Sequence, residues 1–275
     1  MNGSVLATIC AFTTRKNLCL YISLLLLSVP PVEAEGTQPN ILFIVVDNQP
    51  ASILGTYGNP DVKTPNIDRL ANEGVRYTRA FAVHGMCSPT RATLLTGIMP
   101  SQHGVQDWLD DEEMESWPSD WNAIREYRTL PYTLKNRGYQ TSLIGKWHLG
   151  LDWPWKGGEK PPDSVIGKGD SKATCDLFDW SKPIKGGPLG AGFDYYFGDD
   201  VPNMPPYAFI ENDRLTCDPV DVDGRELMKQ SVMKGGHIHG IGPGEEGWRL
   251  ENVMPAITDK AVGYIQEQSK KAEPF

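Results

Sequence analysis

The chain has 275 residues, of which 40% are hydrophobic and 22% are charged. This length and composition suit a globular protein with a full core and exclude a disordered chain. The formal net charge of -9 argues against nucleic acid, or an anionic membrane surface, as the main partner. An anionic substrate would therefore need a local cluster of positive groups or a metal ion.

The first 34 residues have the pattern of a signal peptide. Arg15 and Lys16 precede an apolar run at 18–29 that is too short to span a bilayer comfortably, and Ala34 ends a small-x-small cleavage pattern. We expect residues 1–34 to be removed and the rest to be exported to a periplasmic, extracellular or lysosome-like compartment. We do not expect an integral membrane protein; an uncleaved anchor is the alternative.

Strand-like runs alternate with helical patterns along the mature chain. The run at 40–46 (NILFIVV) is almost entirely apolar, which is typical of a central strand buried on both faces. Further strands are predicted at 75–81 and 139–144. Helices are predicted, from Pro or capping residues at the start and helical spacing or a terminal Gly, at 65–73 after Thr64, 89–96 after Ser88, 130–137 and 255–269. This alternation predicts an α/β fold with a largely parallel sheet.

Two stretches interrupt this pattern, at about 151–192 and 201–247. They are rich in Gly and Pro and show no periodicity. Long loops in a compact domain are usually functional, so we expect them to line a substrate cleft, with plain surface loops as the alternative. They contain Cys175 and Cys217, which could form a disulfide in an oxidising compartment or remain free thiols.

The string CSPTRATLLTG begins at Cys87, at the start of a predicted helix. Free backbone N–H groups and the helix dipole favour an anion there. Arg91 adds a fork of donors near the first turn. Taken alone, Cys87 could be an inert thiol and Arg91 a solvated charge.

The string resembles the signature of the type I sulfatases. That resemblance implies that Cys87 is oxidised to formylglycine by a formylglycine-generating or radical maturation enzyme. In the family, one oxygen of the hydrated aldehyde attacks the sulfur of a sulfate ester, and the other later expels the sulfate.

A second motif, GKWHLG, follows the predicted strand at 139–144. Lys146 and His148 are two residues apart, so in an extended segment their side chains point the same way. One offers an ammonium for a sulfate oxygen, and the other an imidazole for proton transfer. The motif resembles the second sulfatase signature, which implies that Lys146 binds substrate and His148 deprotonates the hydroxyl that expels sulfate.

Asp47 and Asn48 follow the first predicted strand, where ligand sites of open α/β sheets lie. Their oxygens suit a hard cation such as calcium, although Asp-Asn also commonly starts a turn. The resemblance implies one calcium ion with Asp47, Asn48 and the modified Cys87 as ligands. The family commonly has a second aspartate where this chain has Asn48.

Three later segments, at 192–198, 205–214 and 247–265, resemble the arylsulfatase A-like branch and are expected to form scaffold and cleft wall. The resemblance thus covers 35–275 and implies an alkaline-phosphatase-like three-layer α/β/α sandwich with a large mixed, mostly parallel sheet. Family members continue with a further active-site His, a second metal pair and a second Lys, so we expect an N-terminal portion, truncated at the C-terminus. His237 and His239 lie too early to supply the missing His.

The function implied is hydrolysis of sulfate esters on a sulfated small molecule or glycan. Two alternatives remain open at this point. One is a phosphoester or phosphonate hydrolase of the same superfamily, and the other is a non-catalytic secreted protein that binds sulfated glycans.

Overall fold

The computed structural model describes residues 38–109, 124, 127–162, 165, 173–230 and 240–275. The predicted signal peptide at 1–34 and the two late histidines, His237 and His239, lie outside these residues. The chain divides into two units after Pro39, and all the helices and strands below belong to the second unit, Asn40–Phe275. Within the described ranges, no helix has the length and apolar character needed to cross a membrane.

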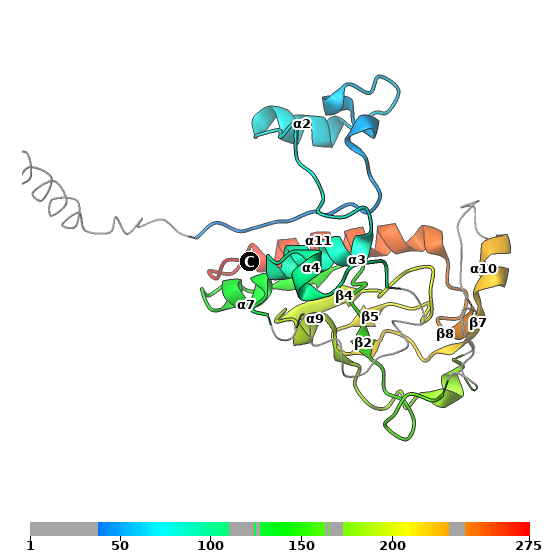
Figure 1. Cartoon of the computed structure of the whole chain (residues 1–275). Helices are drawn as coiled ribbons and strands as arrows, with labels where there is room; N and C mark the ends of the chain where they lie inside the picture. The colour runs from blue at the N-terminus through cyan, green and yellow to red at the C-terminus, as the bar shows by residue number, and fades with distance from the viewer. Residues whose placement is uncertain (1–37, 110–123, 125–126, 163–164, 166–172, 231–239) are drawn as a thin grey trace, which may run out of the picture. The chain divides into compact units, whose positions relative to one another are not determined.

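The site lies at a four-stranded sheet in the order β1-β4-β5-β6, of which β4 and β5 are labelled in Figure 1. Its strands are β1 (Ser142–Ile144), β4 (Tyr195–Gly198), β5 (Ile210–Glu211) and β6 (Arg214–Leu215). β1 and β4 pair in parallel, whereas the β4–β5 and β5–β6 pairs are antiparallel. The predicted α/β class with a mixed sheet is therefore confirmed, and the parallel pairing of this sheet lies between β1 and β4.

The two stretches predicted to be long loops contain short elements. In them lie β2 (Leu151–Asp152), η3 (Cys175–Leu177), β3 (Lys185–Gly186), α9 (Gly187–Gly190), β7 (Val220–Asp223), α10 (Gly224–Gln230) and β8 (Ile241–Gly244). β2 pairs with β3 and β7 with β8, both antiparallel. Cys175 and Cys217 are free thiols.

The predicted helices are present, with small changes in their bounds. They are α2 (Pro65–Glu73), α3 (Cys87–Thr96), α7 (Leu130–Lys135) and α11 (Val253–Gln268); short helices η1 (Ala51–Ile53), η2 (Gly55–Tyr57), α4 (Pro100–His103) and η4 (Leu250–Asn252) accompany them.

Of the two capping predictions, the one for Thr64 is confirmed and the one for Ser88 is wrong. Ser88 is not an N-cap, because α3 begins at Cys87 and Met86 is its N-cap residue. The Ser88 hydroxyl instead accepts a hydrogen bond from the Leu109 N–H at 3.3 Å. Thr64 occupies the N-cap position of α2 as predicted, and its hydroxyl donates to Asp68 at 3.0 Å without accepting a hydrogen bond from the helix backbone.

Helix α11 packs on the sheet (Figure 1). Tyr264 of α11 stacks on Tyr195 of β4 with ring centroids 5.4 Å apart. Lys260 forms a 3.0 Å ion pair with Glu211 of β5 and lies over the Phe197 ring. These contacts fix β4, the strand that positions the residues after β1.

The main core joins α3 to the ends of β1 and β4. Its fully or almost fully buried members include Ala92 of α3, Trp147 just after β1, Tyr196 of β4 and Ile210 of β5. Burial of a large apolar side chain such as Ile210 contributes about 1.5–3 kcal/mol to stability, so this contact between α3 and the strand ends is well held.

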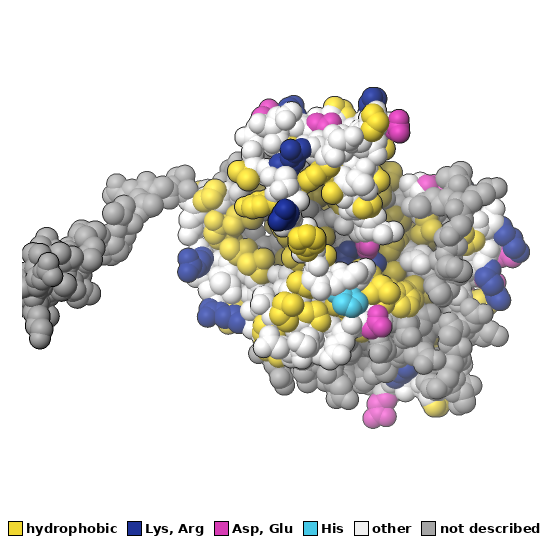
Figure 2. Space-filling model, turned by 45° about the horizontal axis from the view of Figure 1, so that its top comes forward, with side chains coloured by type: hydrophobic (Ala, Val, Ile, Leu, Met, Phe, Trp, Pro, Cys, Tyr) yellow, Lys and Arg dark blue, Asp and Glu magenta, His cyan; other side chains and the backbone are white. Residues whose placement is uncertain are grey.

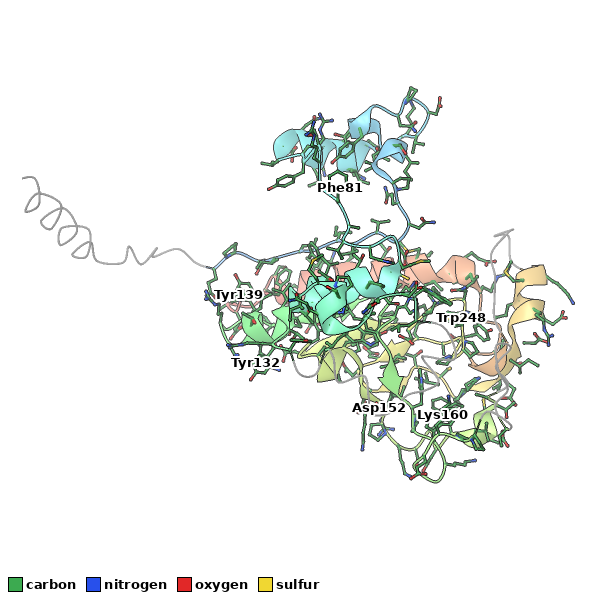
Figure 3. The ribbon with its side chains drawn as sticks, viewed as in Figure 1. Phe81, Tyr132, Tyr139, Asp152, Lys160 and Trp248 are labelled. Atoms are coloured by element: carbon green, nitrogen blue, oxygen red, sulfur yellow. The ribbon has the colours of Figure 1, made fainter. Side chains whose placement is uncertain are left out.

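The predicted strands at 40–46 and 75–81 are wrong, because neither segment forms a strand, and the second bends at Thr78 and Arg79. Their apolar side chains are exposed; Phe43 is 66% exposed, and Phe81, labelled in Figure 3, is 87% exposed. Figure 2 shows hydrophobic side chains, in yellow, exposed on the face of the molecule that it presents. An apolar run forms a strand only where a neighbour pairs with its backbone, and here the backbone contact seen is the Ile41 N–H to the Phe275 carbonyl at 2.7 Å.

Candidate active site

Cys87 is the first residue of α3, and Arg91 follows one turn later. The first N–H groups of a helix have no partner within it, so they and the dipole favour negative charge beside Cys87. The Arg91 guanidinium donates to the Lys146 carbonyl at 2.6 Å. That hydrogen bond ties the start of α3 to the segment after β1.

The segment 145–150 follows β1 and is held against the residues at the end of β4. Its N–H groups donate in turn to carbonyls of Phe197, Asp199 and Asp200, at 2.8, 2.9 and 3.1 Å. The backbone is tightly wound, with positive φ at Gly145, His148 and Gly150. Glycines at both ends of GKWHLG allow this winding, because glycine tolerates positive φ.

Gly198 makes the close approach of the two segments possible. A Cβ at position 198 would lie 2.0 Å from the Gly145 carbonyl oxygen. We expect Gly198→Ala to destabilise the fold by roughly 1–3 kcal/mol or more, since backbone atoms cannot move aside cheaply. Denaturant unfolding checks this. Gly263→Ala in α11 is the control, because a Cβ there meets no atom within 4 Å and should leave stability equal or higher; equal losses in both variants would contradict the account.

His148 is fully buried, and its ring is oriented by two hydrogen bonds. Nε2 lies 2.9 Å from the Leu109 carbonyl, which can only accept, so Nε2 carries the proton. The unprotonated Nδ1 therefore faces the Cys87 sulfur at 3.1 Å. Burial, together with the Lys146 ammonium, lowers the pKa of His148 to about 4. A neutral imidazole at pH 7 can accept a proton from the group at position 87.

Lys146 joins the sulfur and the carboxylate of the site. Its ammonium lies 3.6 Å from the Cys87 sulfur and 3.0 Å from an oxygen of Asp47. Arg91 lies 3.5 Å from the same oxygen. Burial acts to raise the pKa of Asp47, but the two cations outweigh it and the pKa lies below its ordinary value. Two cations facing one carboxylate leave positive charge for an anionic ligand.

The structure brings together five of the six predicted site residues, but the backbone conformation of one differs from the prediction. The five are Asp47, Cys87, Arg91, Lys146 and His148. Lys146 and His148 were expected to share one side of an extended segment. His148 instead has a left-handed backbone with φ of 52°, and its ring still reaches Cys87. Asn48 is exposed at a turn with φ of 54°, as the alternative reading of Asp-Asn predicts.

Asp199 and Asp200 were missed in the sequence. They are 1% and 5% exposed, directly after β4. Burial raises the pKa of Asp199 to about 7 and that of Asp200 to about 6. Among the described residues, neither carboxylate oxygen of Asp199 has a hydrogen-bond partner. Paired acids directly after the apolar strand YYFG were the available signal.

The sulfatase family model matches residues 39–275, so the chain belongs to the sulfatase family. Human arylsulfatase D is 35% identical over 201 residues, which cover 73% of this chain and 28% of that protein. An N-acetylgalactosamine-6-O-sulfatase of Bacteroides thetaiotaomicron is 31% identical over 270 residues, covering 86% of this chain and 46% of that protein.

A solved structure from work on the metabolism of multiple glycosaminoglycans by Bacteroides thetaiotaomicron aligns with a TM-score of 0.62 and 26% identity. The alignment covers 87% of this chain and 50% of that one. The chain thus spans half or less of the length of these relatives. The fold is that of the sulfatases, which the sequence predicted as alkaline-phosphatase-like.

Proposed function

We propose that this chain carries the nucleophile-bearing part of a formylglycine-dependent sulfatase, which hydrolyses sulfate esters of a small molecule or glycan. The observation that supports this most strongly is the convergence of His148 Nδ1 and the Lys146 ammonium on the Cys87 sulfur, at 3.1 and 3.6 Å. A structural thiol has no need of a neutral base and an ammonium at contact distance.

The proposed modification converts the Cys87 side chain to an aldehyde. An oxidant supplied by the maturation enzyme removes two electrons and two protons to give a thioaldehyde, and water hydrolyses the C=S bond, so that the sulfur leaves as hydrogen sulfide. When present, the hydrated aldehyde supplies the oxygen nucleophile. Lys146 and Arg91 would hold sulfate oxygens and offset their charge. His148 would accept the proton from a hydroxyl at position 87. Overall, one water and R–O–SO₃⁻ give R–OH and hydrogen sulfate, with cleavage of the S–O bond to the alcohol.

Calcium fits this donor set only in part. Asp47 offers a carboxylate near the positive groups, and Asn48 could offer an amide oxygen, both suitable for a hard cation. Within the described part of the chain, no group of three or more His, Cys, Asp or Glu could hold a metal ion. We propose that Asp47, Asn48 and the modified position 87 bind calcium with ligands from elsewhere in the protein. The ion would offset sulfate charge.

The test of function compares a sulfate ester and a phosphate ester of the same alcohol, 4-nitrophenol. The whole protein of which we propose this chain to be part, coproduced with a maturation enzyme and supplied with calcium, is expected to hydrolyse 4-nitrophenyl sulfate much faster than 4-nitrophenyl phosphate. Preference for the phosphate would favour the phosphoester hydrolase. Hydrolysis of neither, with binding of sulfated glycan retained, would favour the non-catalytic protein. The signal-like N-terminal segment supports export of the protein, whichever of these functions it has.

The Asn48 assignment has its own test. If Asn48 is a calcium ligand, Asn48→Asp should tighten calcium binding modestly, because affinity at oxygen sites rises with ligand charge, and Asn48→Ala should weaken it. Calorimetric titration of calcium into the wild type and both variants measures this. Equal affinity in all three would remove Asn48 from the metal site and leave it as a turn residue.

A further inference from the structure

The backbone of His148 is held by the carboxylate of Asp200, a residue that lies outside both the CSPTR and the GKWHLG motifs. The His148 N–H lies 2.9 Å from a side-chain oxygen of Asp200 and 3.1 Å from the Asp200 carbonyl. The Gly150 N–H donates to Asp200 as well. Both donors belong to residues with positive φ, at 52° and 81°.

This contact opposes a conformational cost. A left-handed backbone is unfavourable for a residue with a Cβ, so His148 needs external support to remain there. A buried hydrogen bond to a charged acceptor is among the stronger hydrogen bonds in proteins, and this one can provide that support. The ring of His148 can then reach both Leu109 and Cys87.

Asp194 offers a comparison with Asp200, because it lies at the opposite end of the β1–β4 strand pair, away from Cys87 and His148. Asp194 precedes β4, and its side chain accepts from the Thr141 N–H and hydroxyl, each at 3.0 Å. Asp194 also pairs with Lys135 at the surface of α7. Both acids therefore fasten the β1 segment to the β4 segment, but Asp200 alone of the two holds His148.

We propose that Asp200 is a positioning residue, whose side chain holds the backbone of residues 148–150 in the conformation that presents the His148 imidazole to position 87. This inference rests on the proposed function for its catalytic meaning. The geometry itself can be tested without any activity.

The experiment compares the reactivity of two buried histidines toward diethylpyrocarbonate. His148 and His103 are 0% and 1% exposed, and both should be protected in the wild type. His103 is held independently, by Thr93 at 3.0 Å and the Val105 N–H at 3.1 Å. Peptide mass spectrometry of the full chain, in the wild type, Asp200→Ala, Asp200→Asn and Asp194→Ala, gives a rate for each histidine.

In Asp200→Ala, we expect the rate at His148 to rise about tenfold or more, as loss of such a hydrogen bond implies, with His103 unchanged. Asp200→Asn retains an amide oxygen that can accept from the His148 N–H, so it should stay near the wild type. Asp194→Ala should leave the ratio of the two rates unchanged. An unchanged ratio in Asp200→Ala with both rates low would overturn the proposal, and so would an unchanged ratio in Asp200→Ser.

If Asp200→Ala is poorly folded, its failure is visible at His103, and Asp200→Ser provides a milder substitution read by the same ratio. These rates do not depend on formylglycine or turnover. A protein that hydrolyses no sulfate ester but shows the selective rise refutes the proposed function and leaves the positioning role standing. An active sulfatase that shows no selective rise at His148 refutes the positioning role of Asp200 and leaves the proposed function standing.

Discussion

Cys87→Ala is expected to abolish sulfate ester hydrolysis, with a loss on the order of 10⁴-fold or more, as when a covalent nucleophile is removed from a hydrolase. Alanine provides neither thiol nor any precursor of an aldehyde. The loss should appear in kcat, because Lys146 and Arg91 still offer positive charge to the substrate. Steady-state kinetics with 4-nitrophenyl sulfate measures the loss in kcat. A binding isotherm of the same ester on the Cys87→Ala variant, which does not hydrolyse it, checks that substrate binding survives.

The matched control is Cys217→Ala, which makes the same chemical change at a half-buried thiol outside the site. Burial raises the pKa of Cys217 to about 11, so this thiol is unreactive at neutral pH. Its variant should keep full activity. Retained activity in Cys87→Ala, or an equal loss in both variants, would remove position 87 from the chemistry.

His148→Asn is expected to lower kcat by roughly 10²–10⁴-fold, the usual contribution of a positioned general base. Asparagine is the informative replacement, because it tolerates a left-handed backbone better than alanine does and lacks a base. The imidazole is assigned to the step that releases sulfate, which follows release of the alcohol. Rapid mixing should therefore show a burst of alcohol in the first turnover, followed by slow turnover.

His103→Asn separates this effect from loss of stability. His103 is also buried, but its partners are Thr93 and Val105 within the α3–α4 region. Its variant should melt at a lower temperature and show no burst. Normal kinetics in His148→Asn would show that another group accepts the proton, and a burst in both variants would show that the burst reports instability.

Much of the site could be predicted because its motifs are local. CSPTR combines the proposed nucleophile with a helix start, and the helix end at Gly97 follows from the tolerance of glycine for positive φ. GKWHLG was correctly placed after a predicted strand, but the extended conformation predicted for Lys146 and His148 was wrong at His148, which has a φ of 52°. The helix start, the helix end and the placement after a strand depend on neighbours within a few residues, so a sequence pattern carries them.

Features that depend on distant partners were predicted less well. The run at 40–46 has strand composition, yet whether it pairs depends on a neighbour elsewhere in the chain. Asp200 meets His148 only because β4 pairs with β1 in parallel, with Ile144 opposite Phe197. Sequence spacing gives no register between segments 52 residues apart, so this contact had to be seen in the structure.

The mass of the peptide that contains position 87 tests the central claim most directly. The protein is coproduced with a formylglycine-generating enzyme that matures another sulfatase in the same cells, and the peptide is trapped with a hydrazine reagent. We predict that the thiol of Cys87 is replaced by an aldehyde, while Cys175 and Cys217 remain thiols. A free thiol at Cys87, alongside full conversion of the other sulfatase, would contradict the proposed mechanism for this chain.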